Sequence, residues 1–370
     1  MPNTPPVVVP VVNKEEFMLP DNILTWDLSG SFDFDKDGNQ VKRDFIYEIY
    51  LNGNKISTSV SGFISLAEGS HELNFKVIDK RGASSTAVVP VLVKNIVTKF
   101  GGKIQGDGQQ QIKILKDLGV EYGRPASIAV STFDGKSNRL DEFFAAGIKC
   151  VVNINNANSN QTLPFPTDLV TYEKQLRKVL DVYASKISVA VIENEPTNQN
   201  YYNGTMAQYL AELAVAVRVC HEYGVLVADG CVHAENVIQI INNDPRPSKG
   251  VPLVKELLAG YKNIPLDFVN VHTRSINNTY PENQIVETVN YIRSYTGHDV
   301  ISNEWHTEGA KVALGRSTVL DNICKQWKEA KVKISMIWSG DGGTGQSEAD
   351  PVGLNGVLTE FGDAFIKAIK

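Results

Sequence analysis

One pattern repeats from about residue 96 to the end of the chain: a short apolar run is followed by an amphipathic helical stretch. The strand candidates are residues 96–101, 121–126, 148–154, 187–193, 225–230, 266–272, 299–303 and 332–338. The helix candidates are residues 108–118, 138–146, 167–184, 205–223, 252–262, 282–296, 317–330 and 356–369. Eight such units predict a (β/α)8 TIM barrel, in which parallel strands close into a cylinder inside a ring of helices.

The main structural alternative is an open, doubly wound sheet. Such a sheet normally carries a glycine-rich phosphate-binding turn with GxGxxG spacing after its first strand. The segment 101–108, GGKIQGDG, is rich in glycine but has neither that spacing nor a GK[ST] motif. The segment 339–345, SGDGGTG, fails the same test. The sequence therefore favours the barrel and gives little support to nucleotide binding.

Residues 20–95 show a different sequence pattern. Short strands such as 45–51 and 73–78 are separated by turn residues such as Asn52-Gly53, and no stretch shows helical periodicity. This pattern predicts a small all-β sandwich. The segments 31–38 and 69–87 resemble the PKD and related Ig-like modules that are often attached to secreted carbohydrate enzymes. We therefore expect two domains: a Pro-rich stem and Ig/PKD-like sandwich over 1–95, and a barrel over 96–370.

Four aspartates in the first domain have the spacing of a calcium-binding loop. Asp33, Asp35, Asp37 and Asp44 fall at positions 1, 3, 5 and 12 of an EF-hand pattern. The flanking segments resemble strands rather than helices, and the last ligand is Asp rather than Glu. We therefore favour a solvated acidic turn, with a surface calcium ion as the alternative.

Composition narrows the function. The net charge is −6 and Lys/Arg residues do not cluster, which argues against nucleic-acid binding. No apolar run approaches the roughly 20 residues that a membrane helix needs. The cysteines are interpreted as buried thiols, with Cys150–Cys231 as the one bridge to check. The N-terminus has no signal-peptide pattern, and its abrupt Pro-rich start suggests a chain from which a leader was removed.

Polar residues follow most of the predicted barrel strands. They are Arg124, Asn153, Asn155, Glu195, Asp229, His272, Glu304 and Trp338. The carboxyl ends of barrel strands meet at one rim, where barrel enzymes carry their active sites. Two of these residues, Glu195 and Glu304, come directly after apolar runs. Such a carboxylate pair suits glycoside hydrolysis, in which one carboxyl donates a proton and the other attacks the anomeric carbon.

At these positions the sequence resembles clan A retaining glycoside hydrolases, with the family 39 and family 5 branches nearest. The segment 192–196, IENEP, matches the Asn-Glu-Pro motif of strand four, and 302–305, SNEW, matches the nucleophile motif of strand seven. The resemblance implies that Glu195 is the acid/base and Glu304 the nucleophile. Glu193, before the motif, is a departure, and we consider it as a third acid or a salt-bridged rim residue.

The same resemblance implies roles in substrate binding. Asn194 would bond the sugar 2-hydroxyl, Arg124 would support the nucleophile, His272 would line the site, and Trp338 would form a sugar platform. We also take Asn153, Trp305 and Tyr201 as candidate substrate-binding residues. Six of these seven have a structural alternative: an ion pair for Arg124, a core histidine for His272, packing for the two tryptophans, a strand end for Asn153 and a loop aromatic for Tyr201.

The sequence therefore predicts a secreted, periplasmic or surface-tethered enzyme that cleaves β-glycosidic bonds of a polysaccharide or oligosaccharide with retention. No cofactor is implied, because two carboxylates and water suffice. We expect a monomer whose partner is its carbohydrate substrate. One alternative is a metal-dependent barrel hydrolase using His233, His272 and His306. The other is a non-catalytic carbohydrate-binding protein.

Overall fold

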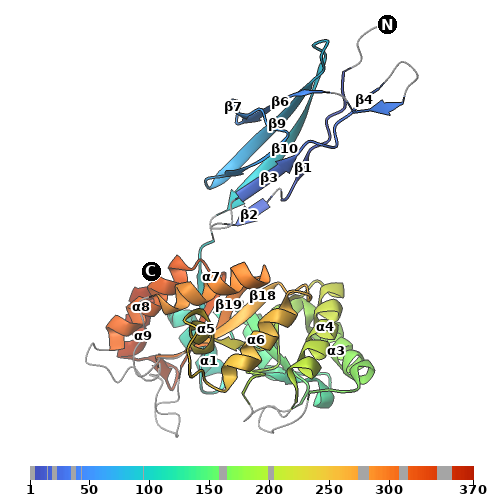
Figure 1. The fold of residues 1–370 in the computed structure, drawn as a ribbon. Helices are drawn as coiled ribbons and strands as arrows, with labels where there is room; N and C mark the ends of the chain where they lie inside the picture. Colours follow the sequence, from blue (N-terminus) through green and yellow to red (C-terminus); the bar gives the residue numbers. More distant parts are fainter. Residues whose placement is uncertain are drawn as a thin grey trace. The chain divides into compact units, whose positions relative to one another are not determined.

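The computed structural model describes residues 5–14, 16–18, 23–34, 39–42, 44–94, 96–157, 165–198, 204–273, 283–307, 316–339 and 352–370. The chain forms two compact units, Met1–Ile96 and Val97–Lys370 (Figure 1). The first contains strands only among its described residues, and the second alternates strands and helices.

Two small sheets form most of the first unit. The three-stranded sheet is antiparallel, with the order β1 (Val11–Val12), β3 (Ile23–Asp27) and β8 (Ser61–Ser65). The five-stranded sheet has the order β2 (Glu16–Met18), β10 (Ser84–Lys94), β9 (Gly69–Ile78), β6 (Ile46–Leu51) and β7 (Asn54–Ser57). Only its β2–β10 pair is parallel. A short hairpin joins β4 (Asp33–Phe34) to β5 (Gln40–Val41).

The alternating sequence of these strands explains how they pack. In β9, Leu73, Phe75 and Val77 are buried, while the residues between them are partly exposed. Leu73 and Phe75 join Trp26 in one apolar core. The turn between β6 and β7 is the predicted Asn52-Gly53, and both residues have positive φ (49° and 81°). Asn-Gly readily adopts this conformation, which matches the twist of a two-residue hairpin.

The second unit contains a closed barrel of eight parallel strands, in agreement with the predicted TIM barrel (Figure 1). The strands are β11 (Lys99–Lys103), β12 (Tyr122–Gly123), β14 (Lys149–Asn155), β15 (Ile187–Ile192), β16 (Leu226–Ala228), β18 (Phe268–Thr273), β19 (Asp299–Trp305) and β20 (Ile334–Trp338). Pairing of β11 with β20 closes the barrel. The short strands β13 (Ile128–Ala129) and β17 (Val232–His233) extend β14 and β18 at the rim.

The helices agree with the predicted ranges to within a few residues, and one is additional. They are α1 (Gly108–Asp117), α2 (Asn138–Ala145), α3 (Leu169–Tyr183), α4 (Met206–Glu222), α5 (Ala234–Ile241), α6 (Gly250–Tyr261), α7 (Gln284–Thr296), α8 (Arg316–Glu329) and α9 (Glu360–Ile369). The additional helix is α5. The shorter elements are the 3-10 turns Val130–Thr132 and Ala184–Lys186 and the hairpin of β21 (Gly353–Leu354) with β22 (Val357–Leu358).

Each barrel strand buries both of its faces. In β15, Val189 and Val191 join the cluster inside the barrel, while Ala190 and Ile192 join the layer between the barrel and the helices. This is the period-two arrangement expected of a strand that is covered on both sides. The inside cluster also contains Ile301 of β19. The polar residues beyond it on these two strands come at the carboxyl end of the barrel.

The cysteine prediction is confirmed. Cys150, Cys220, Cys231 and Cys324 are all buried and none forms a disulfide, so Cys150 and Cys231 are not bridged. None of the described helices combines the length and hydropathy needed to cross a membrane.

Candidate active site

Glu195 and Glu304 meet at the carboxyl ends of β15 and β19, together with His272 of β18. One carboxylate oxygen of each glutamate and one ring nitrogen of His272 all lie within 4.8 Å of one another. All three residues are buried, with 6% exposure for Glu304 and less for the others. The two carboxyl groups that the sequence singled out therefore face each other across a largely enclosed space.

Two cations hold the carboxylate of Glu304. Arg124 Nη1 donates to Glu304 Oε2 at 2.6 Å, and Lys103 Nζ donates to the same oxygen at 3.1 Å. His306 Nε2 lies 3.4 Å from the other oxygen. Burial alone would raise the pKa of Glu304, but the charges of Lys103 and Arg124 outweigh it and hold the pKa well below its usual range. Glu304 is therefore an ionised carboxylate, as a nucleophile must be.

Histidines surround Glu195 instead. His272 Nδ1 lies 3.1 Å from Oε1, Asn198 Nδ2 donates to Oε2 at 2.9 Å, and His233 Nε2 lies 3.8 Å from Oε2. Burial raises the pKa of Glu195, but the hydrogen bond with His272 and the charges of His272 and His233 bring the pKa below its ordinary value. The carboxylate of Glu195 is therefore contacted by two imidazole rings and one amide.

A chain of asparagines fixes the orientation of His272. Its Nε2 lies 2.8 Å from Asn303 Oδ1, which also accepts a hydrogen bond from Asn270 Nδ2 at 2.9 Å. Asn303 Nδ2 donates to Asn153 Oδ1 at 2.9 Å. Because Asn303 Oδ1 is an acceptor, His272 Nε2 must carry a hydrogen. His272 Nδ1 and Glu195 Oε1 then need one proton between them to be hydrogen-bonded.

Asn153 also orients the segment that carries Glu195. Its Nδ2 donates to the carbonyl oxygen of Glu193 at 2.9 Å, and it lies 3.4 Å from Asn194 Oδ1. Arg124 Nη2 donates to the same Asn194 oxygen at 2.9 Å. The arginine that holds Glu304 therefore also holds the neighbour of Glu195, so one side chain sets the relative position of both glutamates.

The two tryptophans lie in different places. Trp338 ends β20 beside the site, with its ring centroid 4.5 Å from that of His306 and 5.9 Å from Lys103 Nζ. Trp305 is fully buried, packs against Phe365 of α9 and donates a hydrogen bond to Ser335 Oγ. The expectation that Trp305 lines the site is therefore not met, because its indole lies in the layer outside the barrel.

The reason is a change of register in β19. Its pairing with β18 shifts between Asn270 and His272, and its pairing with β20 shifts between Ser302 and Trp305. Such an irregularity interrupts strict alternation and re-aims the side chains that follow it. Glu304 consequently points to the site, and Trp305 points away from it.

Lys103 is a site residue that the sequence analysis missed. The first strand was predicted to end at residue 101, and Lys103 was read as part of a glycine-rich loop. The strand in fact ends at Lys103. The rule that chemistry gathers at strand ends would have selected Lys103 had that boundary been placed correctly.

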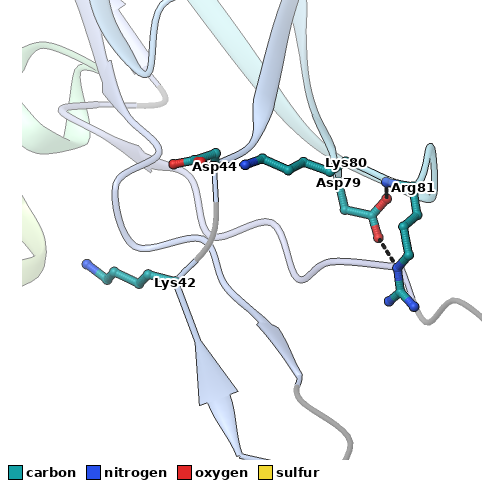
Figure 2. Close-up of a pocket in the computed structure, with 5 residues that line it drawn as sticks. All are labelled: Lys42, Asp44, Asp79, Lys80 and Arg81. Carbon is teal, nitrogen blue, oxygen red and sulfur yellow. Dashed lines mark hydrogen bonds and ion pairs between the residues drawn. The ribbon is translucent and has the colours of Figure 1, made fainter.

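Other expectations have different outcomes. Tyr201 lies outside the described residues. Asp35 and Asp37 of the suggested calcium loop also lie outside them, while Asp33 is buried and Asp44 pairs with Lys80 at 2.7 Å. Figure 2 shows this part of the first unit, a pocket lined by Lys42, Asp44, Asp79, Lys80 and Arg81. Asp79 accepts the backbone N–H groups of Arg81 and Ala83, so it serves the turn between β9 and β10.

Comparison with solved structures places the barrel among glycoside hydrolases in fold. An endo-β-1,4-glucanase from Xanthomonas axonopodis pv. citri is 9% identical, with a TM-score of 0.54 over 74% of this chain and 98% of that chain. A family 128 (subgroup II) endo-β-1,3-glucanase from Sorangium cellulosum is 13% identical, with a TM-score of 0.52 over 73% of this chain and 98% of that chain. At these identities the likeness concerns the fold alone.

A family 39 glycoside hydrolase from Bacteroides cellulosilyticus WH2 covers more of the chain. It is 14% identical over 88% of this chain and 76% of that chain, with a TM-score of 0.49, which is too low to carry an argument. No protein-family model matches the sequence, and no curated protein matches it.

Proposed function

We propose that this chain is a retaining glycoside hydrolase that cleaves β-glycosidic bonds of a plant or microbial polysaccharide or oligosaccharide. The observation that carries the proposal is the approach of Glu195 and Glu304 to within 4.8 Å, oxygen to oxygen. Retaining enzymes hold their carboxyl groups about 5–5.5 Å apart, whereas inverting enzymes need roughly 6.5–9.5 Å to admit a water molecule between carboxyl and sugar. The different surroundings of the two glutamates support different roles.

In the first step, Glu304 attacks the anomeric carbon while the bond from that carbon to the leaving oxygen breaks. The leaving oxygen takes a proton from Glu195, and a glycosyl-enzyme ester forms on Glu304. Lys103 and Arg124 keep Glu304 ionised beforehand. In the second step, Glu195 takes a proton from water, the water oxygen attacks the anomeric carbon, and Glu304 departs as a carboxylate.

The proton for the first step has a source in the structure. His272 Nε2 already donates to Asn303, so the contact between His272 Nδ1 and Glu195 Oε1 needs one proton between the two groups. When a glycosidic oxygen comes within reach of Glu195, this shared proton can pass through Glu195 to the leaving group. His272 is in this account a proton-holding partner of the acid/base.

Other residues would bind the sugar. We propose that Asn194 bonds the 2-hydroxyl and that Trp338 provides a platform, since its indole N–H has no hydrogen-bond partner among the described residues. Arg124 and Asn153 are engaged with Glu304 and Asn194, which supports orienting roles for them. For Tyr201 we keep the proposal from the sequence that it binds the substrate.

The test is a panel of β-linked polysaccharides and oligosaccharides, with the first-formed anomer of the product followed by NMR. We expect the anomeric configuration to be retained, because the two carboxyl groups are too close for a single displacement by water. An inverted product would exclude the two-step mechanism. If glycans bind to the protein without turnover, the chain is instead a carbohydrate-binding module.

Lys103→Met gives a prediction for pH dependence. Lys103 is one of two cations that lower the pKa of Glu304, so its removal raises that pKa. The nucleophile must be ionised, and the acid limb of kcat/KM therefore moves to higher pH. We expect kcat/KM to fall by roughly tenfold or more as well, as for the loss of a charge-assisted hydrogen bond. An activated aryl glycoside is the substrate to use, and Lys113→Met on the exposed side of α1 is the control. An unmoved acid limb would contradict the assignment.

A metal-dependent reaction has less support. Glu195, His272 and Glu304 could offer three ligand atoms, but Lys103 and Arg124 already contact Glu304. A divalent cation would have to approach these two positive charges. His233 and His272 have ring centroids 6.1 Å apart, and His306 lies against Trp338. The polar groups of the site thus fit two carboxylates with counter-cations better than a metal centre.

For the first unit we propose an accessory role as an Ig/PKD-like module. Its two mainly antiparallel sheets and shared apolar core are compatible with that assignment. The described candidate side chains all come from residues after 100, so we expect it to contribute no reacting group. We also propose that the protein works outside the cytoplasm, where polysaccharides are met, and that it is a monomer.

A further inference from the structure

A second pair of glutamates lies behind the candidate active site. Glu193 follows β15 directly, and Glu212 lies on α4; neither has any exposed area. The Glu193 side chain does not turn toward Glu195 and Glu304. Its Oε1 accepts the backbone N–H of Asn156 at 2.5 Å. Its Oε2 and both carboxyl oxygens of Glu212 are shielded from solvent, and the two carboxyl groups are hydrogen-bonded to each other.

Two buried carboxyl groups in contact cannot both be ionised without a large electrostatic cost. Within the described part of the chain, the titratable groups that act on them are Tyr172 of α3 and Tyr209 of α4, and neither is a cation. Tyr172 hydrogen-bonds to Glu212, which by itself lowers the pKa of Glu212. Burial, and then the charge of Glu193, raise the pKa of Glu212 well above its ordinary value. The hydrogen bond from Asn156 favours the ionised form of Glu193. Glu212 is accordingly the protonated member, and it donates to Glu193.

The backbone at Glu193 and Glu195 has an unfavourable conformation, which neighbouring contacts must stabilise. Glu193 and Glu195 both have positive φ, 67° and 50°, a region that is unfavourable for a residue with a side chain. The N–H of Glu193 donates to the carbonyl of Ile154 at 3.0 Å, and its own carbonyl accepts from Asn153. With Oε1 bound to Asn156, three groups of Glu193 are fixed to the end of β14. On the α4 side, the carboxyl group of Glu193 meets that of Glu212.

We propose that Glu193 and Glu212 share one proton and act as a positioning pair, which locks the left-handed turn at Glu193 and so sets the places of Asn194 and Glu195. This inference rests on the proposed function for its catalytic consequence, but the pair itself can be tested without turnover. Glu193 is in this account a positioning residue, rather than the third acid or the salt-bridged rim residue that the sequence suggested.

The first experiment measures the unfolding midpoint of the wild type and of Glu212→Gln from pH 5 to pH 8. Glutamine keeps the shape and the hydrogen-bond donor but needs no proton. The folded wild type holds a proton on Glu212 that the unfolded chain releases above its ordinary pKa, so wild-type stability falls as pH rises in this window. We expect the midpoint of Glu212→Gln to rise relative to wild type by roughly 2–4 °C per pH unit. Glu256→Gln, on an exposed position of α6, is the matched control and should follow the wild type.

The second experiment tests positioning with Glu212→Met, which has the length of glutamine but cannot donate to Glu193. We expect kcat for substrates with poor leaving groups to fall on the order of 10–100-fold, as for a misplaced catalytic group. Activated aryl glycosides should lose less, because their leaving group needs no proton. Glu212→Gln should stay close to wild type on both. The imidazole ¹⁵N shifts of His272, which contacts Glu195, should move in Glu212→Met, while those of exposed His221 should not.

These outcomes decide the proposal. A midpoint difference between Glu212→Gln and wild type that does not change with pH would overturn the shared proton. Equal losses of kcat on every leaving group, together with unchanged His272 shifts, would overturn the positioning role. If Glu212→Met does not fold, the stability measurement on Glu212→Gln still decides whether the pair exists. If no glycoside is turned over, the proposed function fails, while the stability and NMR measurements still test the pair.

Discussion

Glu304→Ala should abolish glycosyl-enzyme formation and lower kcat on the order of 10⁶-fold, as for the nucleophile of other enzymes with covalent intermediates. Lys103 and Arg124 would remain at the site with no carboxylate between them. A small anion such as azide should therefore be drawn into the space. Azide can attack the anomeric carbon from the side of the missing carboxylate and give a glycosyl azide of inverted configuration. The measurement is turnover of an activated aryl glycoside with added azide, and NMR of the product.

The matched control for this variant is Glu329→Ala, which removes an exposed glutamate of α8 and should leave kcat unchanged. Because Glu304→Ala leaves two cations without their partner, its unfolding midpoint is measured alongside. A folded Glu304→Ala with near wild-type turnover would show that another group attacks the sugar. A glycosyl azide of retained configuration would likewise show that another group attacks the sugar.

Much of this site follows from the sequence because two regularities act together. The alternation of apolar runs and helical stretches predicts the barrel, and the barrel places every strand end on one rim. Glu195, Glu304, Arg124 and His272 were therefore selected without knowledge of any contact. The helices were predicted in the same way, because their apolar residues recur with the period of a helix and not with that of a strand.

The predictions that failed depend on local backbone geometry, about which a periodic sequence pattern carries no information. Trp305 was taken as a candidate because it follows Glu304 at a strand end, but the shift of register between Ser302 and Trp305 leaves its indole outside the barrel. Glu193 was read as a third acid or a salt-bridged rim residue, but its backbone has positive φ and its carboxylate accepts the N–H of Asn156, just after β14. Lys103 was missed by a strand boundary two residues short. Each of these depends on which hydrogen bonds the backbone makes, and that depends on residues far away in the sequence.

The sequence also did not show which residues hydrogen-bond to His272. Asn303 lies between Asn270, His272 and Asn153, and its side chain joins β14, β18 and β19. The sequence shows an asparagine at a strand end but not which amide oxygen faces which ring nitrogen. Only the assembled network shows that His272 Nε2 carries a hydrogen, and from this comes the proton held between His272 and Glu195.

Glu195→Ala should affect substrates according to their leaving groups. General acid catalysis is worth about 10²–10⁴-fold, so kcat for natural glycans with poor leaving groups should fall by that factor. Aryl glycosides with acidic phenols leave without a proton, and their first step should be affected much less. Hydrolysis of the intermediate also slows, because Glu195 no longer takes a proton from water. Azide needs no deprotonation, so it should restore turnover and give a glycosyl azide of retained configuration.

The contrast between the two variants separates the roles of the glutamates. Both remove one carboxyl group, yet only Glu304→Ala should give an inverted azide, since only Glu304 forms the bond to the sugar. Asn198→Ala is the control for Glu195→Ala, because it removes a hydrogen-bond donor to Glu195 and leaves the carboxyl in place. Its loss should be smaller on every substrate. Equal losses in Glu195→Ala across all leaving groups would mean that Glu195 is not the proton donor. The proton shared by His272 and Glu195 would then have to reach the leaving oxygen by another route, and His233, 3.8 Å from Glu195, is the group in place to carry it.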